Sequence, residues 1–341
     1  MNVGWSVLFV FLISFFLTML LRKYALSKSL MDIPNERSSH AIPTPRGGGL
    51  SIVIAFILSL FFMQWCQFIS YETMLAGVIG GSVVSVIGFM DDHGHIAARW
   101  RLLAHAIASI WILFWVGGFP SITLGGVVFD FSWLGQILGV LYLIWMLNLY
   151  NFMDGIDGIA GVEAVSVCLS TCALYWIAGA ENLIWGPLLL SAGVAGFLFW
   201  NFPPARIFMG DAGSGFLGLM LGLLSLQAAR VAPDFFWAWL ILLGVFIVDA
   251  TVTLLRRLIR GEKVYEAHRS HAYQFASRKS GGHMPVTIGV GLINIFWLLP
   301  LALFVTCYGL DGSVGLLIAY APLSVLAWRL NAGGTELKGD A

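Results

Sequence analysis

The chain has little charge. Only 11% of its 341 residues are Asp, Glu, Lys or Arg, whereas an ordinary soluble domain has roughly 25%. Hydrophobic residues make up 59% of the sequence, and the mean hydropathy is +0.88. Because one water-soluble core cannot bury so much apolar surface, the composition excludes a soluble globular protein and predicts a polytopic membrane protein. The formal net charge is zero, so bulk charge gives no indication of a nucleic-acid partner.

Cysteine is also scarce. The four cysteines are Cys66, Cys168, Cys172 and Cys307, and all of them lie in or beside apolar runs. Cys168 and Cys172 stand one helical turn apart, but two thiols lack the remaining ligands that a metal site needs. We therefore expect the cysteines to be small packing residues.

The N-terminus lacks the features of a cleavable signal peptide. No basic residue precedes its apolar run at 3–21, Arg22 and Lys23 follow the run, and no small-residue cleavage site comes next. We expect this run to be a first transmembrane helix with its N-terminus outside.

Apolar runs of membrane length fill most of the chain. With about 20 apolar residues for one span, the sequence predicts eleven transmembrane helices. They are expected near 3–21, 48–66, 73–90, 102–118, 133–150, 159–178, 183–200, 214–230, 236–255, 286–307 and 313–329. There is no internal repeat and no low-complexity segment. The predicted fold class is therefore all-α, with residues 1–341 forming a single transmembrane domain.

The basic residues orient these spans. With the N-terminus outside, 17 of the 18 Lys and Arg residues fall on the inner side, and only Arg230 falls outside. This bias is the one that the positive-inside rule requires. It places the C-terminus in the cytoplasm as well. The main cytoplasmic loops are then expected at 22–47, 91–101, 151–158, 201–213 and 256–285.

Acidic residues gather at the inner ends of three spans. Asp91 and Asp92 follow the third span, Asp154 and Asp157 follow the fifth, and Asp211 follows the seventh. If the stretch around 154–157 is helical, the three-residue step places both carboxylates on one face. A single Asp at a helix end is usually a cap, but three clusters on one side of the membrane indicate a common site.

Carboxylates collected in this way need a counter-charge. Oxygen ligands suit Mg²⁺ or Mn²⁺, which commonly sits on one or two carboxylates together with substrate phosphates. Glycines beside each Asp permit a close approach of the backbone to a ligand, and the basic loop 256–285 contains His268 and His271, which could hold phosphate. A metal, a diphosphate and a position at the membrane boundary together predict phosphoryl transfer to a membrane acceptor. Asp249, within the ninth span, is a functional or buried-pair candidate.

These motifs, in this order, resemble a known family. The segments that carry the resemblance are 31–40, 43–49, Asp91-Asp92, 151–158, Asn201 with 208–213, and 268–271. Over almost its whole length the chain resembles the polyprenyl-phosphate N-acetylhexosamine-1-phosphate transferases of glycosyltransferase family 4, which include the MraY and WecA enzymes. It is most similar to the small bacterial (WbpL-like) members that start O-antigen synthesis.

The resemblance implies a role for each matching residue. It makes Asp91 a catalytic residue that deprotonates the lipid phosphate, or a nucleophile in an older scheme, and makes Asp92 its support. It makes Asp211 the principal Mg²⁺ ligand. Residues of the nucleotide and diphosphate site are then Asn151, Asp154, Asp157 and Asn201. The motif His268-Arg269-Ser270-His271 is implied to hold phosphate or sugar.

The resemblance also implies a reaction and its partners. An N-acetylhexosamine-1-phosphate passes from a UDP-N-acetylhexosamine to undecaprenyl phosphate in the lipid bilayer, and UMP is released. The enzyme is expected in the bacterial inner membrane with a cytoplasmic active site, at the first step of O-antigen or lipopolysaccharide synthesis. Mg²⁺ is the expected cofactor, with Mn²⁺ as an alternative. A homodimer is left open.

Two departures from the family bear on the substrate. His95 stands where the muramoyl-pentapeptide enzymes have Lys, and His-Arg-Ser-His replaces their run of three histidines. Both favour a simpler UDP-sugar, although a phospho-N-acetylmuramoyl-pentapeptide transferase remains the alternative within the family.

Two other classes of membrane protein are alternatives. A transporter would place its charges near the bilayer midplane, often between repeated halves, whereas the acidic residues here lie at one face and the sequence has no repeat. A CDP-alcohol phosphotransferase would carry a denser Asp-rich signature, whereas the acidic residues here are spread over three separate loops. The sequence does not identify the sugar.

Overall fold

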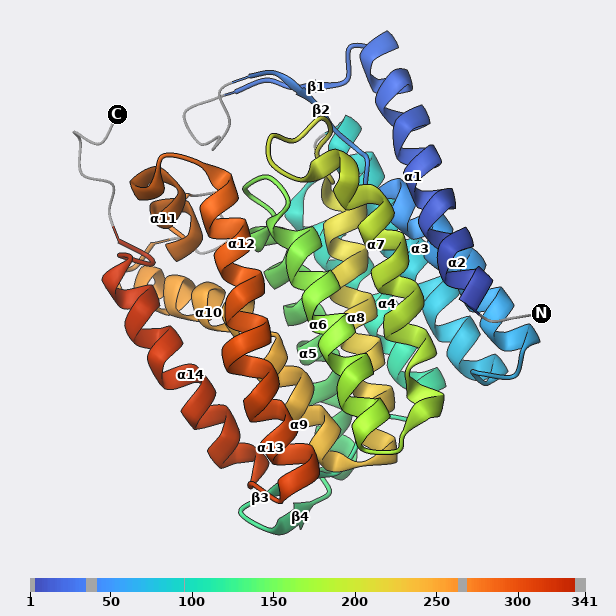
Figure 1. The fold of residues 1–341 in the computed structure, drawn as a ribbon, viewed down its shortest axis with the longest axis vertical. Coiled ribbons are helices and arrows are strands. Elements are labelled where there is room, and N and C mark those ends of the chain that lie inside the picture. Colours follow the sequence, from blue (N-terminus) through green and yellow to red (C-terminus); the bar gives the residue numbers. More distant parts are fainter. Residues whose placement is uncertain (1–3, 35–41, 95, 263–268, 335–341) are drawn as a thin grey trace.

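The computed structural model describes residues 4–34, 42–94, 96–262 and 269–334, and it confirms the all-α class (Figure 1). Only two short antiparallel hairpins interrupt the helices within these ranges. The helices are α1 (Gly4–Ser27), α2 (Leu50–Trp65), α3 (Tyr71–His93), α4 (Ala98–Val116), α5 (Ser132–Met153), α6 (Ile159–Ile177), η1 (Glu181–Leu183), α7 (Trp185–Asn201), α8 (Asp211–Val231), α9 (Pro233–Leu242), α10 (Gly244–Ile259), α11 (Ala272–Ser280), α12 (His283–Ile293), the π-helical turn η2 (Asn294–Leu298), α13 (Leu299–Tyr308) and α14 (Gly312–Arg329). The hairpins are β1 (Met31–Asp32) with β2 (Thr44–Pro45), and β3 (Ile122–Leu124) with β4 (Val127–Phe129).

Every expected span coincides with a helix or with consecutive helices. In the described ranges, nine helical segments are long and apolar enough to cross a membrane, and the pair α9 and α10 would make a tenth. The segment expected at 48–66 is α2, which has only 16 residues. The structure therefore agrees with a polytopic membrane protein, while the count of eleven spans stays a prediction.

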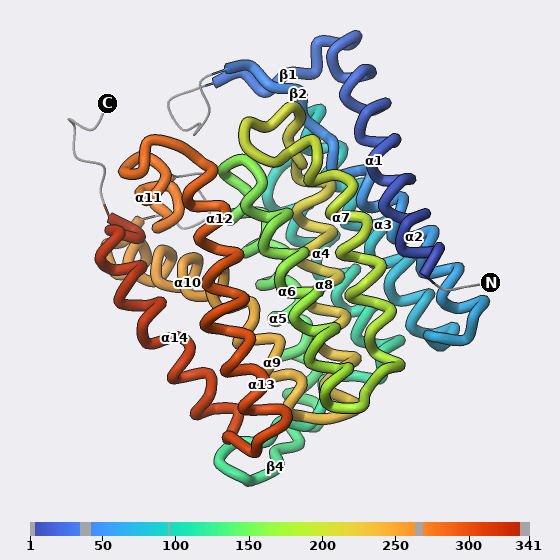
Figure 2. The backbone as a smooth tube through the Cα atoms, in the orientation of Figure 1, coloured from blue at the N-terminus to red at the C-terminus, as the bar shows by residue number. Residues whose placement is uncertain are grey.

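The expected ninth span, 236–255, is not a straight helix. Its two parts, α9 and α10, meet at an angle of 69°, and Figure 2 shows the chain turning at this break. The second part carries Asp249, Arg256 and Arg257. Charged side chains are costly in hydrocarbon, and the bend turns α10 across the bundle, so these side chains meet the loops near α11 instead of lipid.

Helix α8 is the centre of the bundle. Every residue from Ala212 to Leu226 is buried, as expected for a helix that is apolar all round. Glycine permits the close crossings: a Cβ at Gly88 of α3 would lie 2.6 Å from the backbone nitrogen of Ala212, and a Cβ at Gly218 would lie 2.4 Å from the carbonyl oxygen of Met146 in α5. Helices α3 and α5 thus contact α8 backbone to backbone.

The loops expected in the cytoplasm gather at one end of the bundle (Figure 1). The hairpin β1–β2 and helix α11 lie at this end, whereas β3–β4 lies at the other. Several expected loop residues extend helices instead: α1 continues to Ser27, and α3 continues through Asp91 and Asp92 to His93. Which side of the membrane this end faces remains the prediction made from the basic residues.

Candidate active site

Asp92 holds the first turn of α8. Its carboxylate accepts hydrogen bonds from the backbone N–H groups of Asp211, at 3.0 Å, and of Ala212, at 3.4 Å. Only 3% of this side chain is exposed. It caps the helix from a different element, since its own helix, α3, ends beside it. A Cβ at Gly210 (φ +79°) would lie 2.6 Å from the Asp92 carboxylate, so the close approach that this glycine permits is to Asp92.

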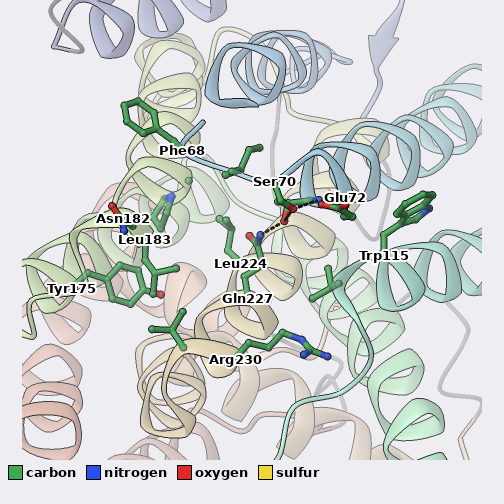
Figure 3. A pocket seen from close by; sticks show the side chains of 16 residues that line it. Phe68, Ser70, Glu72, Trp115, Tyr175, Asn182, Leu183, Leu224, Gln227 and Arg230 are labelled. Atoms are coloured by element: carbon green, nitrogen blue, oxygen red, sulfur yellow. Dashed lines mark hydrogen bonds between the residues drawn. The ribbon is translucent and has the colours of Figure 1, made fainter. Parts of the chain in front are cut away.

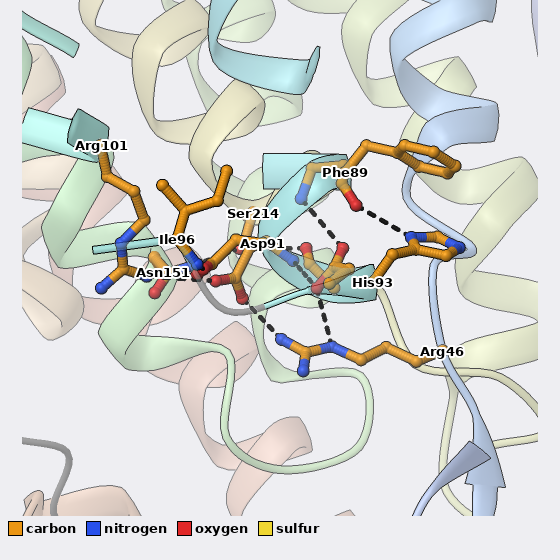
Figure 4. Close-up of polar contacts among 12 residues, drawn as sticks. Arg46, Phe89, Asp91, His93, Ile96, Arg101, Asn151 and Ser214 are labelled. Carbon is orange, nitrogen blue, oxygen red and sulfur yellow. Dashed lines mark hydrogen bonds and ion pairs between the residues drawn. The ribbon is translucent and has the colours of Figure 1, made fainter. Parts of the chain in front are cut away.

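Arg46 joins two of the acidic clusters (Figure 4). Its Nε lies 2.9 Å from Asp92 Oδ1, and its Nη2 lies 2.7 Å from Asp211 Oδ1. The backbone around Arg46 is fixed because Pro45 accepts a hydrogen bond from the N–H of Phe208, whose carbonyl accepts one from Gly48. The segment before α2 and the loop before α8 are thereby paired, and they present Arg46 to both carboxylates.

Asp91 has a different partner. Its carboxylate pairs with Arg101 of α4 and accepts a hydrogen bond of 2.8 Å from the backbone N–H of Ile96 (Figure 4). The same Arg101 atom, Nη1, lies 3.7 Å from Asp211 Oδ2. With 8% of its side chain exposed, Asp91 is enclosed by its own loop and by α4.

Asp154 is the carboxylate without a partner. In the described part of the chain it accepts no hydrogen bond and forms no ion pair, although it is half-buried at the end of α5. Burial raises its pKa well above the usual value, Arg46 opposes the rise, and the nearby Asp211, Asp92 and Asp157 add to it. The three acidic clusters found in the sequence therefore lie close together in the structure.

Asp157, by contrast, ties loops together. Its Oδ2 accepts the N–H of Ala205 at 2.9 Å, and its Oδ1 lies 3.1 Å from Nδ1 of His283. The segment between α5 and α6 is not helical, so Asp154 and Asp157 do not share a helix face. Gly155 and Gly158 explain the break: a Cβ at Gly155 would lie 2.0 Å from the hydroxyl oxygen of Tyr273, and Gly158 has φ +73°.

Asn201 and Asn151 also bind protein groups in this structure. Asn201, 3% exposed, accepts the N–H of Gly158 and donates to the carbonyl of Ile207, both at 3.0 Å. Asn151 donates to the Ser214 hydroxyl at 3.0 Å. We infer that Asn201 shapes the two loops, and that Asn151, which lines a cavity with Asp211, is the better placed of the two to meet a substrate.

The histidine motif is only partly described. His268 lies outside the described residues, and Arg269 is half-buried. His271 is 2% exposed, and its Nδ1 lies 3.3 Å from Asp249 Oδ1. Asp249 also accepts the N–H groups of Ala272 and Tyr273, both at 2.9 Å, at the start of α11. Asp249 therefore forms a buried pair with His271 and fixes this motif. A buried pair was one of the two roles expected for Asp249.

The carboxylates of the site fit a magnesium ion whose remaining ligands come from the substrate. No three His, Cys, Asp or Glu side chains within the described ranges are arranged to hold a metal by themselves. Mg²⁺ does not require that, because one or two carboxylates with waters and substrate phosphates commonly hold it. Asp154 has no partner among the described residues, and Asp211 is 23% exposed. These two could supply ligands of that kind, since the two arginines that contact the site, Arg46 and Arg101, are fewer than its carboxylates.

Comparisons with known proteins identify the family of this chain. The profile of glycosyl transferase family 4 matches residues 74–229. A probable undecaprenyl-phosphate N-acetylglucosaminyl 1-phosphate transferase of Bacillus subtilis is 31% identical over 264 residues, covering 75% of this chain and 72% of that protein. The chain belongs to glycosyl transferase family 4.

Other members of glycosyl transferase family 4 are also similar. An undecaprenyl-phosphate alpha-N-acetylglucosaminyl 1-phosphate transferase of Thermotoga maritima is 28% identical over 85% of this chain and 88% of its own length. A phospho-N-acetylmuramoyl-pentapeptide-transferase of Streptococcus thermophilus is 24% identical over 66% of this chain and 68% of its own. The family resemblance is thus confirmed. The narrower likeness to the O-antigen enzymes stays a prediction, because none of these relatives has that role in its name.

Three residues of this family member were given no role from the sequence. Arg46 precedes the glycines 47–49, and Arg101 counted only as a topology determinant. His283, which contacts Asp157, begins α12. A basic residue at the end of a span satisfies the positive-inside rule whether or not it binds a carboxylate, so only the three-dimensional arrangement separates the two roles.

Proposed function

We propose that this protein transfers an N-acetylhexosamine-1-phosphate from a UDP-sugar to undecaprenyl phosphate. The observation that carries the proposal is the half-buried and unpaired Asp154 beside Asp211, at the end of α8 where the polar loops meet. A carboxylate in that setting is balanced by a cation, and a divalent cation such as Mg²⁺ commonly binds substrate phosphates at the same time. The names of the relatives, with N-acetylglucosaminyl transfer in two of them, support this substrate class.

The donor end of the site is built from Asp154 and Asp211. These would hold Mg²⁺, which when bound neutralises the diphosphate and orients it. Arg46, already 2.7 Å from Asp211, supplies a planar cation suited to phosphate oxygens. Asp92 keeps the first turn of α8 in place, and Asp157 and Asn201 hold the loops on which the nucleotide rests.

The chemical step is one displacement at phosphorus. A phosphate oxygen of undecaprenyl phosphate forms a bond to the phosphorus that carries the sugar, and the bond from that phosphorus to the bridging oxygen breaks. UMP leaves with the electron pair, and undecaprenyl-diphosphate-sugar remains. Asp91 takes any proton that the attacking phosphate carries, and most of the acceleration comes from positioning and charge neutralisation.

The protein would act at the cytoplasmic face of the bacterial inner membrane, at the first step of O-antigen or another envelope polysaccharide. The basic residues at this end of the bundle support the cytoplasmic assignment.

The decisive measurement is UMP release by purified protein in detergent. The reaction contains undecaprenyl phosphate, Mg²⁺ and one of several UDP-N-acetyl sugars, with UDP-N-acetylmuramoyl-pentapeptide as the alternative donor. We expect release that requires lipid and sugar nucleotide together, that EDTA stops, and that Mg²⁺ or Mn²⁺ restores. Release without the lipid, or undiminished release in EDTA, would contradict the proposal.

A further inference from the structure

A cavity of about 200 Å³ lies beside the acidic site and is lined by residues of the long apolar helices. Its polar lining includes Arg101, His105 and Asp211, and its apolar lining includes Val84, Leu102 and Leu147. These residues come from α3, α4, α5 and α8, all of which begin or end at the loops of the site. The cavity therefore combines charged and apolar side chains, which suits a phosphate that is attached to a hydrocarbon chain.

Arg101 is a basic side chain in the lining of this cavity. Arg101 is one-third exposed and pairs with Asp91, while Nη1 also lies 3.7 Å from Asp211. One turn deeper on the same helix, the Nδ1 of His105 is buried and has no partner within the described ranges. A phosphate bound in the cavity would offer Arg101 an alternative to Asp91 and would place polar oxygens near the unpartnered nitrogen of His105.

Building on the function proposed above, we propose that Arg101 binds the phosphate of the polyprenyl acceptor. When the acceptor binds, Arg101 exchanges its ion pair with Asp91 for one with this phosphate. Asp91 and the incoming phosphate compete for one guanidinium. Binding of the acceptor then does two things: it places the attacking phosphate next to Asp211, and it removes from Asp91 the ion pair that otherwise occupies it.

The positions of the two arginines favour this occupant over the nucleotide diphosphate. Arg46 already lies between Asp92 and Asp211 on the loop side, whereas Arg101 stands on α4 and lines the cavity together with the apolar residues Leu102 and Leu147. A ligand that binds Arg101 in this cavity thus has apolar side chains beside it. A UDP-sugar has no apolar chain to pack against them.

The first test measures lipid binding without turnover. Purified protein is titrated with undecaprenyl phosphate or with undecaprenol, which lacks the phosphate, and bound lipid is counted by native mass spectrometry. We expect the wild type to prefer the phosphate and Arg101→Gln to lose about tenfold in affinity for it. Arg101→Lys, which keeps a charge but not the fork, should lie between them. The matched control is Arg99→Gln, which removes an exposed arginine of the same helix that stacks on Trp100.

The second test examines the competition itself. Asp91→Asn removes the competing carboxylate charge, so we expect it to bind undecaprenyl phosphate several-fold more tightly than wild type while turning over more slowly. The gain should disappear in the double variant Asp91→Asn with Arg101→Gln. A purely structural role of the pair would weaken lipid binding in Asp91→Asn instead of strengthening it.

Three results would overturn the inference. They are unchanged phosphate preference in Arg101→Gln, equal losses in Arg101→Gln and Arg99→Gln, and a higher KM for the UDP-sugar alone, which would assign Arg101 to the donor. Because the binding assays contain no sugar nucleotide, they also separate the two proposals. A protein that binds undecaprenyl phosphate through Arg101 yet releases no UMP from any donor would refute the proposed function and leave the acceptor site standing.

Discussion

The two ends of α8 differ in what their polar groups do. At the end with Asp211, carboxylates outnumber the arginines that contact them, and Asp154 has no partner among the described residues. At the end with Arg230 there is a larger cavity, of about 390 Å³ (Figure 3). There the guanidinium of Arg230 donates to the carbonyls of Gly117 and Gly118, and Gln227 donates to the Thr73 hydroxyl at 2.8 Å.

Cavity size does not distinguish the two ends, because a cavity of about 570 Å³ lined by Asp157 and His283 lies at the loop end as well. The hollow near Arg230 has one unsatisfied polar atom in its lining within the described ranges, the neutral indole nitrogen of Trp115, and an unpaired neutral donor costs far less than an unpaired charge. The hollow near Asp211 is smaller but carries uncompensated charge. The difference indicates that electrostatic imbalance marks the reactive end, and each prediction below tests whether that imbalance is functional.

The largest effect is expected from Asp211→Asn. Loss of the charge that holds the metal and the donor should lower turnover by at least about 10²–10³-fold, with little change in melting temperature, because the asparagine retains the shape of the side chain. UMP release and a thermal melt measure the two quantities. The matched control is Arg230→Gln at the other end of α8, which should leave turnover within about twofold of wild type. Near-normal turnover in Asp211→Asn would remove the metal assignment.

Asp154→Asn should separate activity from stability. We expect turnover to fall by about tenfold to a hundredfold. The pKa of Asp154 is raised in the folded protein, so between the ordinary carboxyl pKa of about 4 and the raised value the folded state holds a proton that the unfolded state has released. Metal-free wild type therefore loses stability as pH rises through this range. The Asn variant does not lose stability in this way. Its metal-free form should therefore melt about 2–4 °C higher than wild type at pH 8.

The pH dependence is the control for that prediction. At pH 5 more of the wild-type carboxyl is protonated, so the difference in melting temperature should shrink, and added Mg²⁺ should shrink it at pH 8 as well. A difference that is the same at both pH values would show that Asp154 is not the titrating group.

The contrast between the two ends also shows what the sequence could and could not predict. Hydropathy and basic residues gave the helices and their order, because every span must be apolar for its full length. The position of acidic residues at the inner ends of three spans, together with the family motifs, selected Asp91, Asp92, Asp154 and Asp211. What they could not give is which carboxylate lacks a partner, because Arg46, Arg101 and the N-terminus of α8 come from distant segments. The 69° break at Leu243 was missed for a similar reason, since apolar composition continues across it.

Asp92→Ala tests whether the cap of α8 matters for chemistry. The variant leaves the N–H groups of Asp211 and Ala212 without their acceptor and Arg46 with one partner fewer. We expect a loss of about 1–2 kcal/mol in unfolding free energy and a fall in turnover of about tenfold, because Asp211 is the first residue of the helix. Denaturant or thermal unfolding and UMP release measure these, and Asp92→Asn should recover part of both.

The chain offers a matched cap on a different helix. Asp311 accepts the N–H groups of Ser313 and Val314 at the start of α14, on a turn outside the proposed site. Asp311→Ala should lower thermal stability without changing turnover. If both alanine variants reduce turnover alike, the effect of Asp92 is general loss of stability and not positioning of Asp211.

The smallest effect is expected from Gln227→Ala at the Arg230 end. The variant removes a hydrogen bond between neutral side chains that links α8 to Thr73 of α3, so it should lower the unfolding free energy by about 0.5–1.5 kcal/mol. Turnover and undecaprenyl phosphate affinity should remain at wild-type values, because the bond lies at the far end of α8 and balances no charge. Thr73→Val, which removes the other partner, should cost a similar amount, and the double variant should cost less than the two single losses together.

A loss of turnover in Gln227→Ala, measured where all of the protein is folded, would mean that the two ends of α8 are coupled. The cavity near Arg230 would then have to be considered part of the catalytic machinery, although the guanidinium of Arg230 is hydrogen-bonded to backbone carbonyls.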